Sequence, residues 1–386
     1  MNILMLTNVY SPLVGGIPRS VEAFAEQFRS RGHRVVVVAP EHDEAAEEDD
    51  VVRYPSLQKV FRQRYSLPLP VPGTIRGIVE EARPDVIHSH HPFLLGDTAQ
   101  LGASLARAPL VYTHHTRYRL NAELGTAMPE GFIEFLMRLI VKYCNGCDAV
   151  VAPSRGMANL LAGNGVTAPV EVIPTGLRLE KFAAGDGAAA RARWGIPQDA
   201  YLVGSVSRLE PEKNPVFLAT AVAEFMLSNS GVHFLMVGDG HSRGEIEAVF
   251  AARGLTDRLH MPGTLENQDL ADAYHAFDVF AYASKTETQG LVVGEALAAG
   301  RPVVALKATG VEDFVSDGEN GRQVDAESLD AFVDARRWMR WQSREHVLRM
   351  RERSREIVRG FSIEHCSERM LGLYQRLIEN HGNQPS

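Results

Sequence analysis

The sequence predicts an α/β protein built from two similar halves, each with a parallel sheet and connecting helices. Apolar, β-rich runs alternate with helical patterns along most of the 386 residues. The β-rich runs are continuously apolar, which is typical of strands buried on both faces in parallel sheets. The alternation pauses at residues 170–182 and then restarts, so two βαβ series follow each other. We expect a ligand in a cleft between the halves, at the carboxyl ends of the strands.

The first half, placed at residues 1–175, opens with a strand in NILMLTN and a helix at residues 18–32. Pro18 can start this helix and Gly32 can end it. Later runs predict the strands HRVVVVAP, DVIHSH, PLVYTHH and DAVVAPS. The last helix, at about residues 364–386, has apolar positions at helical spacing, and we expect it to pack back on this half.

The second half, placed at residues 176–363, follows a hinge near Pro174–Gly176. The small-residue stretch GDGAAA at residues 185–190 is interpreted as a connection. The strands YLVGSVSR, VHFLMVGDG, RLHMPG, DVFAYAS and RPVVAL then alternate with helical patterns. Between Arg336 and Gly360 the helical tail holds nine arginines and three glutamates, a pattern that favours a solvated helical face.

Bulk composition limits the class of protein. The net charge of −8 argues against a surface built for nucleic acid, so any basic site must be local. Three cysteines suit a reducing compartment, and the CNGC pair Cys144 and Cys147 is interpreted as structural. No apolar run reaches the ~18 residues of a membrane span, and the N-terminus lacks the pattern of a signal peptide. We therefore expect a cytoplasmic protein, and its oligomeric state stays open.

Three features suit a diphosphate at the carboxyl ends of strands. Gly15 and Gly16 join the first strand to its helix and let a phosphate approach the backbone. Arg208 and Lys213 follow the first strand of the second half, where two cations suit a diphosphate. The third feature is a helix N-terminus, whose free N–H groups favour an anion. Its first residues are Gly290, Leu291 and Val292.

Glu287 and Glu295 bracket that helix N-terminus. A ligand with hydroxyl groups at both ends and anionic charge in the middle fits this arrangement. A nucleotide sugar has this form, because a diphosphate separates its sugar from its ribose. Fixed positive groups would stabilise the charge that builds on the diphosphate as the sugar leaves, without a metal ion.

Other chemistries have weaker support. The chain has no Asp-x-Asp pair for a divalent ion, and no carboxylate or cysteine completes a spaced zinc set around the histidines of two strand ends. We expect one or two of these histidines to face the cleft as donors. They are His88, His90, His91, His114 and His115. The segment VGDGHSRGE approximates a dinucleotide fingerprint with its third glycine one place late, so hydride transfer stays an alternative.

Together these motifs resemble the retaining glycosyltransferases of family GT4, which have the GT-B fold of two Rossmann-like domains facing across a cleft. The resemblance is carried by the GG turn, YTHHT, SRLEPEKN and ETQGLVVGE. It implies that Glu287 holds hydroxyls of the donor sugar and that Glu295 accepts the ribose hydroxyls. It also implies that Arg208 and Lys213 bind the diphosphate and that the amide of Gly16 lies near the distal phosphate. We expect no cofactor.

The resemblance implies further roles in each domain. His115 matches the histidine beside the donor sugar, and His114 stands where many members carry an aromatic residue. Leu265 lies where members contact the base through backbone groups. The N-terminal domain would bind the acceptor, in a region that holds His91, His114 and Tyr118, and the C-terminal domain would bind the nucleotide sugar.

The segments HHPFLLG, THHTRY and SKTETQGLV look most like the branch that glycosylates lipids, such as diacylglycerol glucosyltransferases and phosphatidylinositol mannosyltransferases. In SLQKVFRQRYSLPLPVP, apolar residues mix with Lys59, Arg62 and Arg64, and such a stretch can lie on an anionic bilayer. We expect a peripheral enzyme on the inner face of the cell membrane that uses a UDP-sugar, with a GDP-sugar as the open alternative. A family member with a soluble acceptor, a nucleotide-sugar epimerase and a non-catalytic sensor stay open as alternatives.

Overall fold

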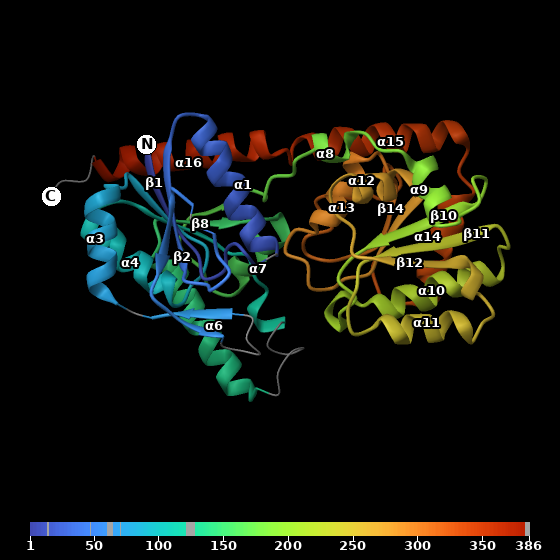
Figure 1. Ribbon diagram of the computed structural model, residues 1–386, viewed down its shortest axis with the longest axis horizontal. Helices are drawn as coiled ribbons and strands as arrows, with labels where there is room; N and C mark the ends of the chain where they lie inside the picture. Colours follow the sequence, from blue (N-terminus) through green and yellow to red (C-terminus); the bar gives the residue numbers. More distant parts are fainter. Residues whose placement is uncertain (14, 47, 60–64, 70, 121–127, 383–386) are drawn as a thin grey trace. The chain divides into compact units, whose positions relative to one another are not determined.

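The computed structural model divides into two compact units, each an α/β structure with helices on a parallel sheet (Figure 1). Unit 1 comprises Met1–Gly176 with Ile363–Ser386, and unit 2 comprises Leu177–Ser362. This architecture confirms the predicted α/β fold class. The structure describes residues 1–13, 15–46, 48–59, 65–69, 71–120 and 128–382.

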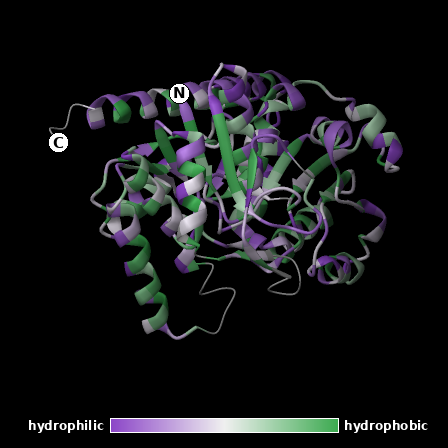
Figure 2. Ribbon diagram, turned by 60° about the vertical axis from the view of Figure 1, so that its left-hand side comes forward, coloured by the Kyte–Doolittle hydropathy of each residue, from purple (hydrophilic) through white to green (hydrophobic). Residues whose placement is uncertain are grey.

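Unit 1 holds a seven-stranded parallel sheet in the order β3-β2-β1-β6-β7-β8-β9. Its strands are β1 (Asn2–Leu6), β2 (Arg34–Pro40), β3 (Val51–Tyr54), β6 (Val86–Ser89), β7 (Leu110–Thr113), β8 (Ala149–Ala152) and β9 (Val170–Val172). The central strands are buried throughout, as their continuous apolar sequences require (Figure 2). Because β1 pairs with β2 on one side and β6 on the other, the chain reverses its direction of sheet growth between β1 and β6.

Helices cover both faces of this sheet. On one face lie α1 (Gly16–Ser30) and the last helix of the chain, α16 (Ile363–Gly382), whose Tyr374 meets Phe28 with ring centroids 5.7 Å apart. The other face carries α3 (Pro72–Ala82), α4 (Leu95–Ala106), α6 (Glu130–Asn145) and α7 (Arg155–Gly163).

Two further strand features of unit 1 bear on the sequence analysis. The pause in the sequence pattern contains β9, which pairs with β8 at the sheet edge and is too short to stand out as a strand. The basic and apolar stretch at residues 56–72 includes a separate antiparallel hairpin of β4 (Ser56–Lys59) and β5 (Tyr65–Pro68). Arg62 and Arg64 of that stretch lie outside the described residues.

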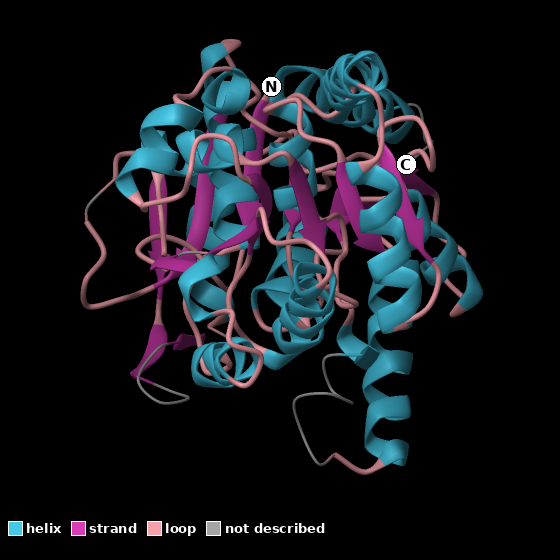
Figure 3. Ribbon diagram, turned by 90° about the vertical axis from the view of Figure 1, so that its right-hand side faces the viewer, coloured by secondary structure: helices cyan, strands magenta, loops and turns pink. Residues whose placement is uncertain are grey.

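Unit 2 holds a six-stranded parallel sheet in the order β12-β11-β10-β13-β14-β15, with helices on both faces (Figure 3). Its strands are β10 (Tyr201–Val206), β11 (Val232–Val237), β12 (Leu259–Gly263), β13 (Val279–Tyr282), β14 (Val303–Leu306) and β15 (Gly321–Val324). Its helices are α8 (Glu180–Ala183), α9 (Gly187–Arg193), α10 (Pro215–Leu227), α11 (Arg243–Ala251), α12 (Asn267–Ala276), α13 (Leu291–Ala298), α14 (Leu329–Arg340) and α15 (Arg344–Arg359), with the short 3₁₀ turns η1 (Pro211–Lys213) and η2 (Thr256–Arg258). Among the described helices of both units, none combines the length and apolar content that a bilayer crossing requires.

The interpretation of GDGAAA as a connection is wrong for its second half, which begins α9. The Asp186 carboxylate caps this helix by accepting the N–H of Ala189 at 2.8 Å. The small residues are needed because α9 lies against α12. A Cβ on Gly187 would stand only 2.3 Å from the carbonyl oxygen of His275.

The interpretation of the basic tail as a solvated face is wrong for Arg336, which lies on the buried side of α14 and is fully buried. Its guanidinium lies 4.7 Å from the ring centroid of Phe332 and 5.9 Å from that of Phe225. Nε donates to the Phe332 carbonyl, whereas Nη1 and Nη2 have no partner among the described residues. Burial lowers the pKa of Arg336 to about 9, so its charged form is costly in this core.

Replacement of Arg336 by an apolar residue should therefore be tolerated or stabilising. We expect Arg336→Met to leave the free energy of unfolding unchanged or to raise it by about 1–4 kcal/mol, because the buried charge that is removed has no ion-pair partner and leaves two of its nitrogens without an acceptor among the described residues. Urea unfolding measures this change. Arg337→Met, at the exposed neighbouring position paired with Asp334, is the matched control and should have little effect. A loss larger than the control's would show that the aromatic contacts of Arg336 outweigh its desolvation.

Candidate functional site

The residues of unit 2 that are predicted to bind the donor lie in the connections that follow the carboxyl ends of its strands. β10 lies between β11 and β13, so the chain reverses its direction of sheet growth between β10 and β13. Ligands of open α/β sheets bind at this kind of reversal. Arg208 and Lys213 follow β10, and Glu287 follows β13, and Lys213 contacts Glu287 although the two are 74 positions apart in sequence.

The Glu287 carboxylate is the centre of this arrangement. Its Oε1 accepts hydrogen bonds from Lys213 Nζ at 2.5 Å, from the Tyr282 hydroxyl at 2.6 Å and from the Ser284 hydroxyl at 3.0 Å. Burial acts to raise the pKa of Glu287, but the charge of Lys213 and these three donors outweigh burial and hold the pKa below its usual value. Glu287 is therefore an anion at neutral pH, and Lys213 is its counter-charge.

The helix α13 begins directly after this carboxylate. Gly290 precedes it with φ +77°, a left-handed conformation that favours glycine. The loop before α13 packs closely against the backbone at Gly310. A Cβ on Gly310 would stand 2.3 Å from the backbone nitrogen of Gln289. Within the described part of the chain, no side chain caps the first turn that Leu291 and Val292 begin. The N-terminus of α13 thus offers backbone donors to an anion.

Glu295 stands on α13, one turn beyond its start. Its Oε2 accepts the Tyr274 hydroxyl at 2.7 Å, and the same hydroxyl lies 3.2 Å from the carbonyl oxygen of Val292. This contact orients the carboxylate from α12. Leu265, in the connection before α12, is partly buried against the same apolar core as Leu291 and Val292.

Arg208 differs from Lys213 in its surroundings. Its side chain is 68% exposed and pairs with Glu212 at 2.9 Å, an i,i+4 contact of a kind that stabilises little in water. Both predicted cations therefore already hold a carboxylate. The sequence analysis missed Glu212, and it also missed Tyr282 and Ser284, although polar residues at the end of an apolar strand were a usable signal.

Two glycines of VGDGHSRGE are required by packing against the segment that carries Arg208. A Cβ on Gly238 would stand 1.8 Å from the carbonyl oxygen of Ser207, and one on Gly240 would stand 2.6 Å from that of Leu209. A side chain at either position would therefore displace the segment that carries Arg208. Gly244 has no such neighbour within 4 Å. Packing accounts for the first two glycines without reference to a dinucleotide.

In unit 1, histidines follow β6 and β7 and form connected pairs. His90 Nδ1 lies 3.0 Å from His115 Nε2, and their rings stack with centroids 5.2 Å apart. His88 bonds Tyr374 of α16 through Nδ1 at 2.5 Å and Thr113 through Nε2 at 2.7 Å. The last helix is thereby tied to the strand that precedes His90.

Burial keeps these imidazoles uncharged at neutral pH. It lowers the pKa of His88 to about 3 and that of His91 and His114 to about 4, and it lowers the pKa of His90 and His115 well below the usual value. A neutral imidazole donates through one nitrogen and accepts through the other. The group can therefore orient hydroxyls, and it adds no positive charge.

The structure separates the two histidines of YTHHT. His114 is 2% exposed, with Nδ1 3.2 Å from the Tyr112 hydroxyl and its ring 5.5 Å from that of Tyr118. His115 is more accessible than His114. His91 is positioned by the loop after β1, because its Nδ1 accepts the backbone N–H of Asn8 at 3.0 Å.

Gly16 stands at the start of α1, where a Cβ would meet no atom within 4 Å. Packing inside unit 1 therefore does not require a glycine at this position. Among the described residues of both units, no group of three or more histidine, cysteine, aspartate or glutamate side chains is arranged to hold a metal ion.

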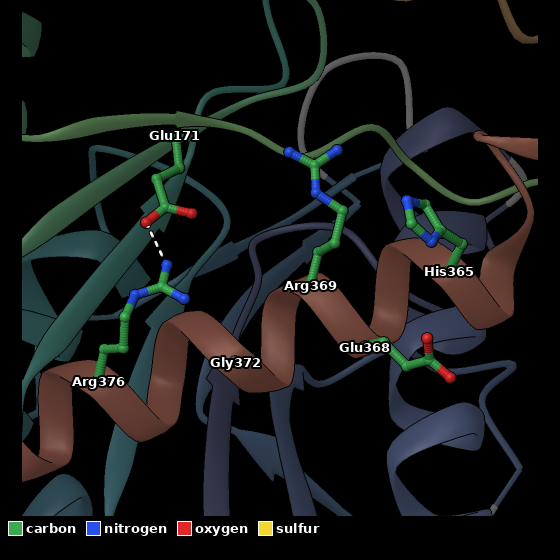
Figure 4. Close-up of a pocket in the computed structure, with 6 residues that line it drawn as sticks. All are labelled: Glu171, His365, Glu368, Arg369, Gly372 and Arg376. Atoms are coloured by element: carbon green, nitrogen blue, oxygen red, sulfur yellow. Dashed lines mark hydrogen bonds and ion pairs between the residues drawn. The ribbon is translucent and has the colours of Figure 1, made fainter.

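A pocket of about 310 Å³ lies between α16 and β9 in unit 1 (Figure 4). Arg376 pairs with Glu171 across it, and Arg369 donates to the Val172 carbonyl at 2.5 Å. No residue predicted for the site lines this pocket, and its arginines are already engaged, so we assign it no role in the reaction. Its lining residues are Glu171, His365, Glu368, Arg369, Gly372 and Arg376.

Comparison with known proteins gives consistent matches along the chain. Residues 14–181 match the family model Glycosyltransferase Family 4, and residues 187–357 match Glycosyl transferases group 1. The chain is 27% identical to an alpha-monoglucosyldiacylglycerol synthase of Acholeplasma laidlawii, over 83% of this chain and 84% of that protein. It is 31% identical to a D-inositol 3-phosphate glycosyltransferase of Nocardia farcinica, over 81% of this chain and 72% of that protein.

A solved structure agrees in fold. The crystal structure of Anabaena HepE in complex with UDP matches with a TM-score of 0.79 at 22% identity, over 98% of this chain and 100% of that chain.

The pairing of Lys213 with Glu287 gives a test of site integrity. We expect Lys213→Met to lower the free energy of unfolding at pH 7 by about 3 kcal/mol, because it leaves a buried carboxylate without a counter-charge. The double variant Lys213→Met/Glu287→Gln should recover part of this loss, since it removes both charges. Urea unfolding of the unsubstituted protein, Lys213→Met, Glu287→Gln and the double variant measures the coupling energy between the two side chains. Strictly additive losses of stability would contradict the predicted coupling.

The same pair predicts a pH dependence. The pKa of Glu287 is lower in the folded protein than in the unfolded chain. Its contribution to stability is therefore present above the unfolded value of about 4.3 and is lost as the pH falls through the folded value. The stability difference between the unsubstituted protein and Glu287→Gln should shrink as the pH is lowered through this window. A difference that grows on acidification would mean that the carboxylate is destabilised by burial.

Proposed function

The chain belongs to glycosyltransferase family 4, and from this premise we propose that it transfers a hexose from a UDP-sugar to a hydroxyl group of a lipid such as diacylglycerol, with retention of configuration. The observation that carries the proposal is the Lys213–Glu287 pair beside the uncapped N-terminus of α13. These groups place cationic, backbone N–H and carboxylate functions within one loop cluster of unit 2. A nucleotide sugar needs these three functions.

We assign the diphosphate to Lys213, Arg208 and the first N–H groups of α13. Negative charge builds on the diphosphate as the sugar leaves, and fixed donors that already point at it stabilise the transition state. In this proposal they act in place of a metal ion. The bond from the anomeric carbon to the phosphate oxygen breaks, and the acceptor oxygen bonds to the same face of the sugar. The proton of the acceptor hydroxyl passes to the leaving phosphate oxygen.

The two glutamates take the ends of the donor. Glu287 is anionic and held by three donors, so it is positioned to accept hydroxyl groups of the sugar. Glu295 is oriented by Tyr274 and takes the ribose hydroxyls. Backbone groups near Leu265 contact the base.

For unit 1 we propose acceptor binding and two roles toward the donor. Neutral His115 donates to the sugar, held in place by His90, and the amide of Gly16 binds the distal phosphate. His91, His114 and Tyr118 belong to the acceptor region. His114 and Tyr118 carry polar groups among aromatic rings, which suits a hydroxyl group attached to an apolar body.

Relatives support two acceptor classes. The Acholeplasma laidlawii relative, named as a glycolipid synthase, aligns over 84% of its length, which favours a lipid acceptor and a peripheral position on the inner face of the cell membrane. The Nocardia farcinica relative, named for an inositol phosphate, favours a soluble acceptor as the second candidate. Epimerisation without an acceptor is the third.

Product analysis with a panel of donors tests the proposal. The protein is incubated with UDP- and GDP-sugars, with diacylglycerol, with an inositol phosphate, or with no acceptor, and released nucleotide and glycosylated product are measured. UDP release that depends on diacylglycerol, with an α-linked product from an α-linked donor, is the expected result. Turnover that depends on the inositol phosphate would support the second candidate, and sugar conversion without an acceptor the third. Loss of turnover with a chelator would overturn the proposed metal independence.

Substitution of the two glutamates separates binding from chemistry. We expect Glu295→Ala to weaken UDP binding by about 10- to 100-fold, because hydrogen bonds to a charged group contribute about 1.5–3 kcal/mol. Glu287→Ala should chiefly lower kcat, since UDP lacks the sugar that Glu287 contacts. Calorimetry and steady-state kinetics measure the two effects. Tyr274→Phe, which removes only the hydroxyl that orients Glu295, should weaken UDP binding less than Glu295→Ala. Equal UDP affinity in Glu295→Ala and the unsubstituted protein would refute the ribose assignment.

A further inference from the structure

The helix α6 carries apolar side chains on a buried face and also on an exposed face beside it. Ile133 and Ile140 are 3% and 2% exposed, and they form the face that packs into unit 1. Phe132, Phe135 and Leu139 are 46%, 49% and 37% exposed. Their spacing of three and four residues places them on one outer face of the helix, which we call the α6 apolar face.

This face is continuous and projects from the unit. The rings of Phe132 and Phe135 have centroids 6.4 Å apart, so they form one apolar surface. In Figures 1, 2 and 3 the N-terminal half of α6 extends beyond the rest of unit 1, and Figure 2 colours much of it as hydrophobic. Isolated exposed apolar residues are ordinary, but a contiguous set of aromatic residues on a projecting helix indicates a contact surface.

Basic side chains border the α6 apolar face. Arg138 and Lys142 are exposed, and they follow Phe135 by three and seven residues, so they lie along the same side of the helix. Neither forms an ion pair with any acidic side chain in the described part of the chain. The acidic residues of the helix, Glu130 and Glu134, both pair with Arg119, whose single positive charge offsets one of the two carboxylates.

We propose that the α6 apolar face, with Arg138 and Lys142, docks unit 1 on an anionic lipid bilayer. Aromatic and aliphatic side chains enter the interfacial region while neighbouring cations meet lipid phosphates, which is how amphipathic helices lie on membranes. The occupant is a bilayer and not a second copy of the chain, because a two-fold contact would bring the same unpaired cations together. This inference rests on the proposed lipid acceptor, since docking brings the enzyme to the surface where that acceptor resides.

Vesicle sedimentation tests the docking surface. The full chain is mixed with vesicles of phosphatidylcholine alone or with added phosphatidylglycerol, and the bound fraction is measured. We expect binding to the anionic vesicles that weakens with salt. The double variant Phe132→Ser/Phe135→Ser should lower this affinity by on the order of tenfold or more, because two partly buried rings are removed. Arg138→Gln/Lys142→Gln should lower binding to anionic vesicles about tenfold, with little change on phosphatidylcholine.

The controls isolate the surface from folding. Leu227→Ser, at a residue 54% exposed on α10 of unit 2, removes a comparable apolar side chain and should bind vesicles as the unsubstituted protein does. Thermal unfolding and UDP affinity verify that the α6 variants are folded. Unchanged vesicle binding in the Phe132→Ser/Phe135→Ser variant would overturn the proposal, and so would failure of the unsubstituted protein to bind at low salt. A dimer that this variant alone dissociates, with vesicle binding unchanged, would assign the face to a second copy.

A separate measurement distinguishes failure of this inference from failure of the proposed function. Transfer to a short-chain diacylglycerol in detergent micelles tests the acceptor class in the unsubstituted protein without a bilayer. Vesicle binding that depends on the α6 apolar face, without transfer to diacylglycerol, would support the docking surface and contradict the proposed acceptor. Transfer in micelles together with unchanged vesicle binding by the Phe132→Ser/Phe135→Ser variant would support the proposed acceptor and contradict the docking surface.

Discussion

The ion pair of Lys213 and Glu287 is the constraint on which the unit 2 site depends. It joins the loop after β10 to the loop after β13, across the point where the direction of sheet growth reverses. Neither charge is tolerable there alone, because both side chains are largely removed from water. In the proposed function, the diphosphate would therefore share Lys213 with Glu287, and ligand binding and site stability would depend on the same cation. A lysine can do this because its three N–H donors are able to serve two acceptors at once.

The two units use the same sheet edge with opposite electrostatics. At the reversal point of unit 2, ionised groups pair with each other and a helix N-terminus adds partial positive charge. At the corresponding edge of unit 1, buried imidazoles are neutral and bond to each other. Charge suits the recognition of a diphosphate, whereas neutral donors and acceptors suit hydroxyl groups. This division supports assignment of donor diphosphate to unit 2 and of hydroxyl-bearing ligand parts to unit 1, from the chemistry of each unit by itself.

Much of the fold followed from sequence because the strands are buried on both faces and read as continuous apolar runs. The strand β9 was not predicted because its three residues show no periodicity. The helix α9 was not predicted because the alanines and glycine next to its cap resemble a linker. In the site, Glu287 and Lys213 were predicted as separate contributors, and their direct contact was not. Sequence spacing cannot show that residues 74 positions apart share a hydrogen bond, because the parallel sheet order brings them together. The prediction that Arg336 is solvated was wrong because counting charges treats every arginine of a basic tail alike. In the structure, α14 places this arginine against the core.

The same distinction between summed and local charge governs the membrane question. A net charge of −8 would oppose approach to an anionic surface only if charges across the whole chain contributed to the interaction. At physiological ionic strength the screening length is about 8 Å, so a bilayer in contact with α6 senses mainly the residues of a turn or two of that helix. There Arg138 and Lys142 are unpaired among described residues, while Glu130 and Glu134 are bound to Arg119. Arg119, Arg138 and Lys142 together outnumber Glu130 and Glu134, so this group of side chains has a net positive charge although the chain as a whole is acidic. In this way a protein whose net negative charge keeps it soluble can still present one surface that attracts anionic lipids.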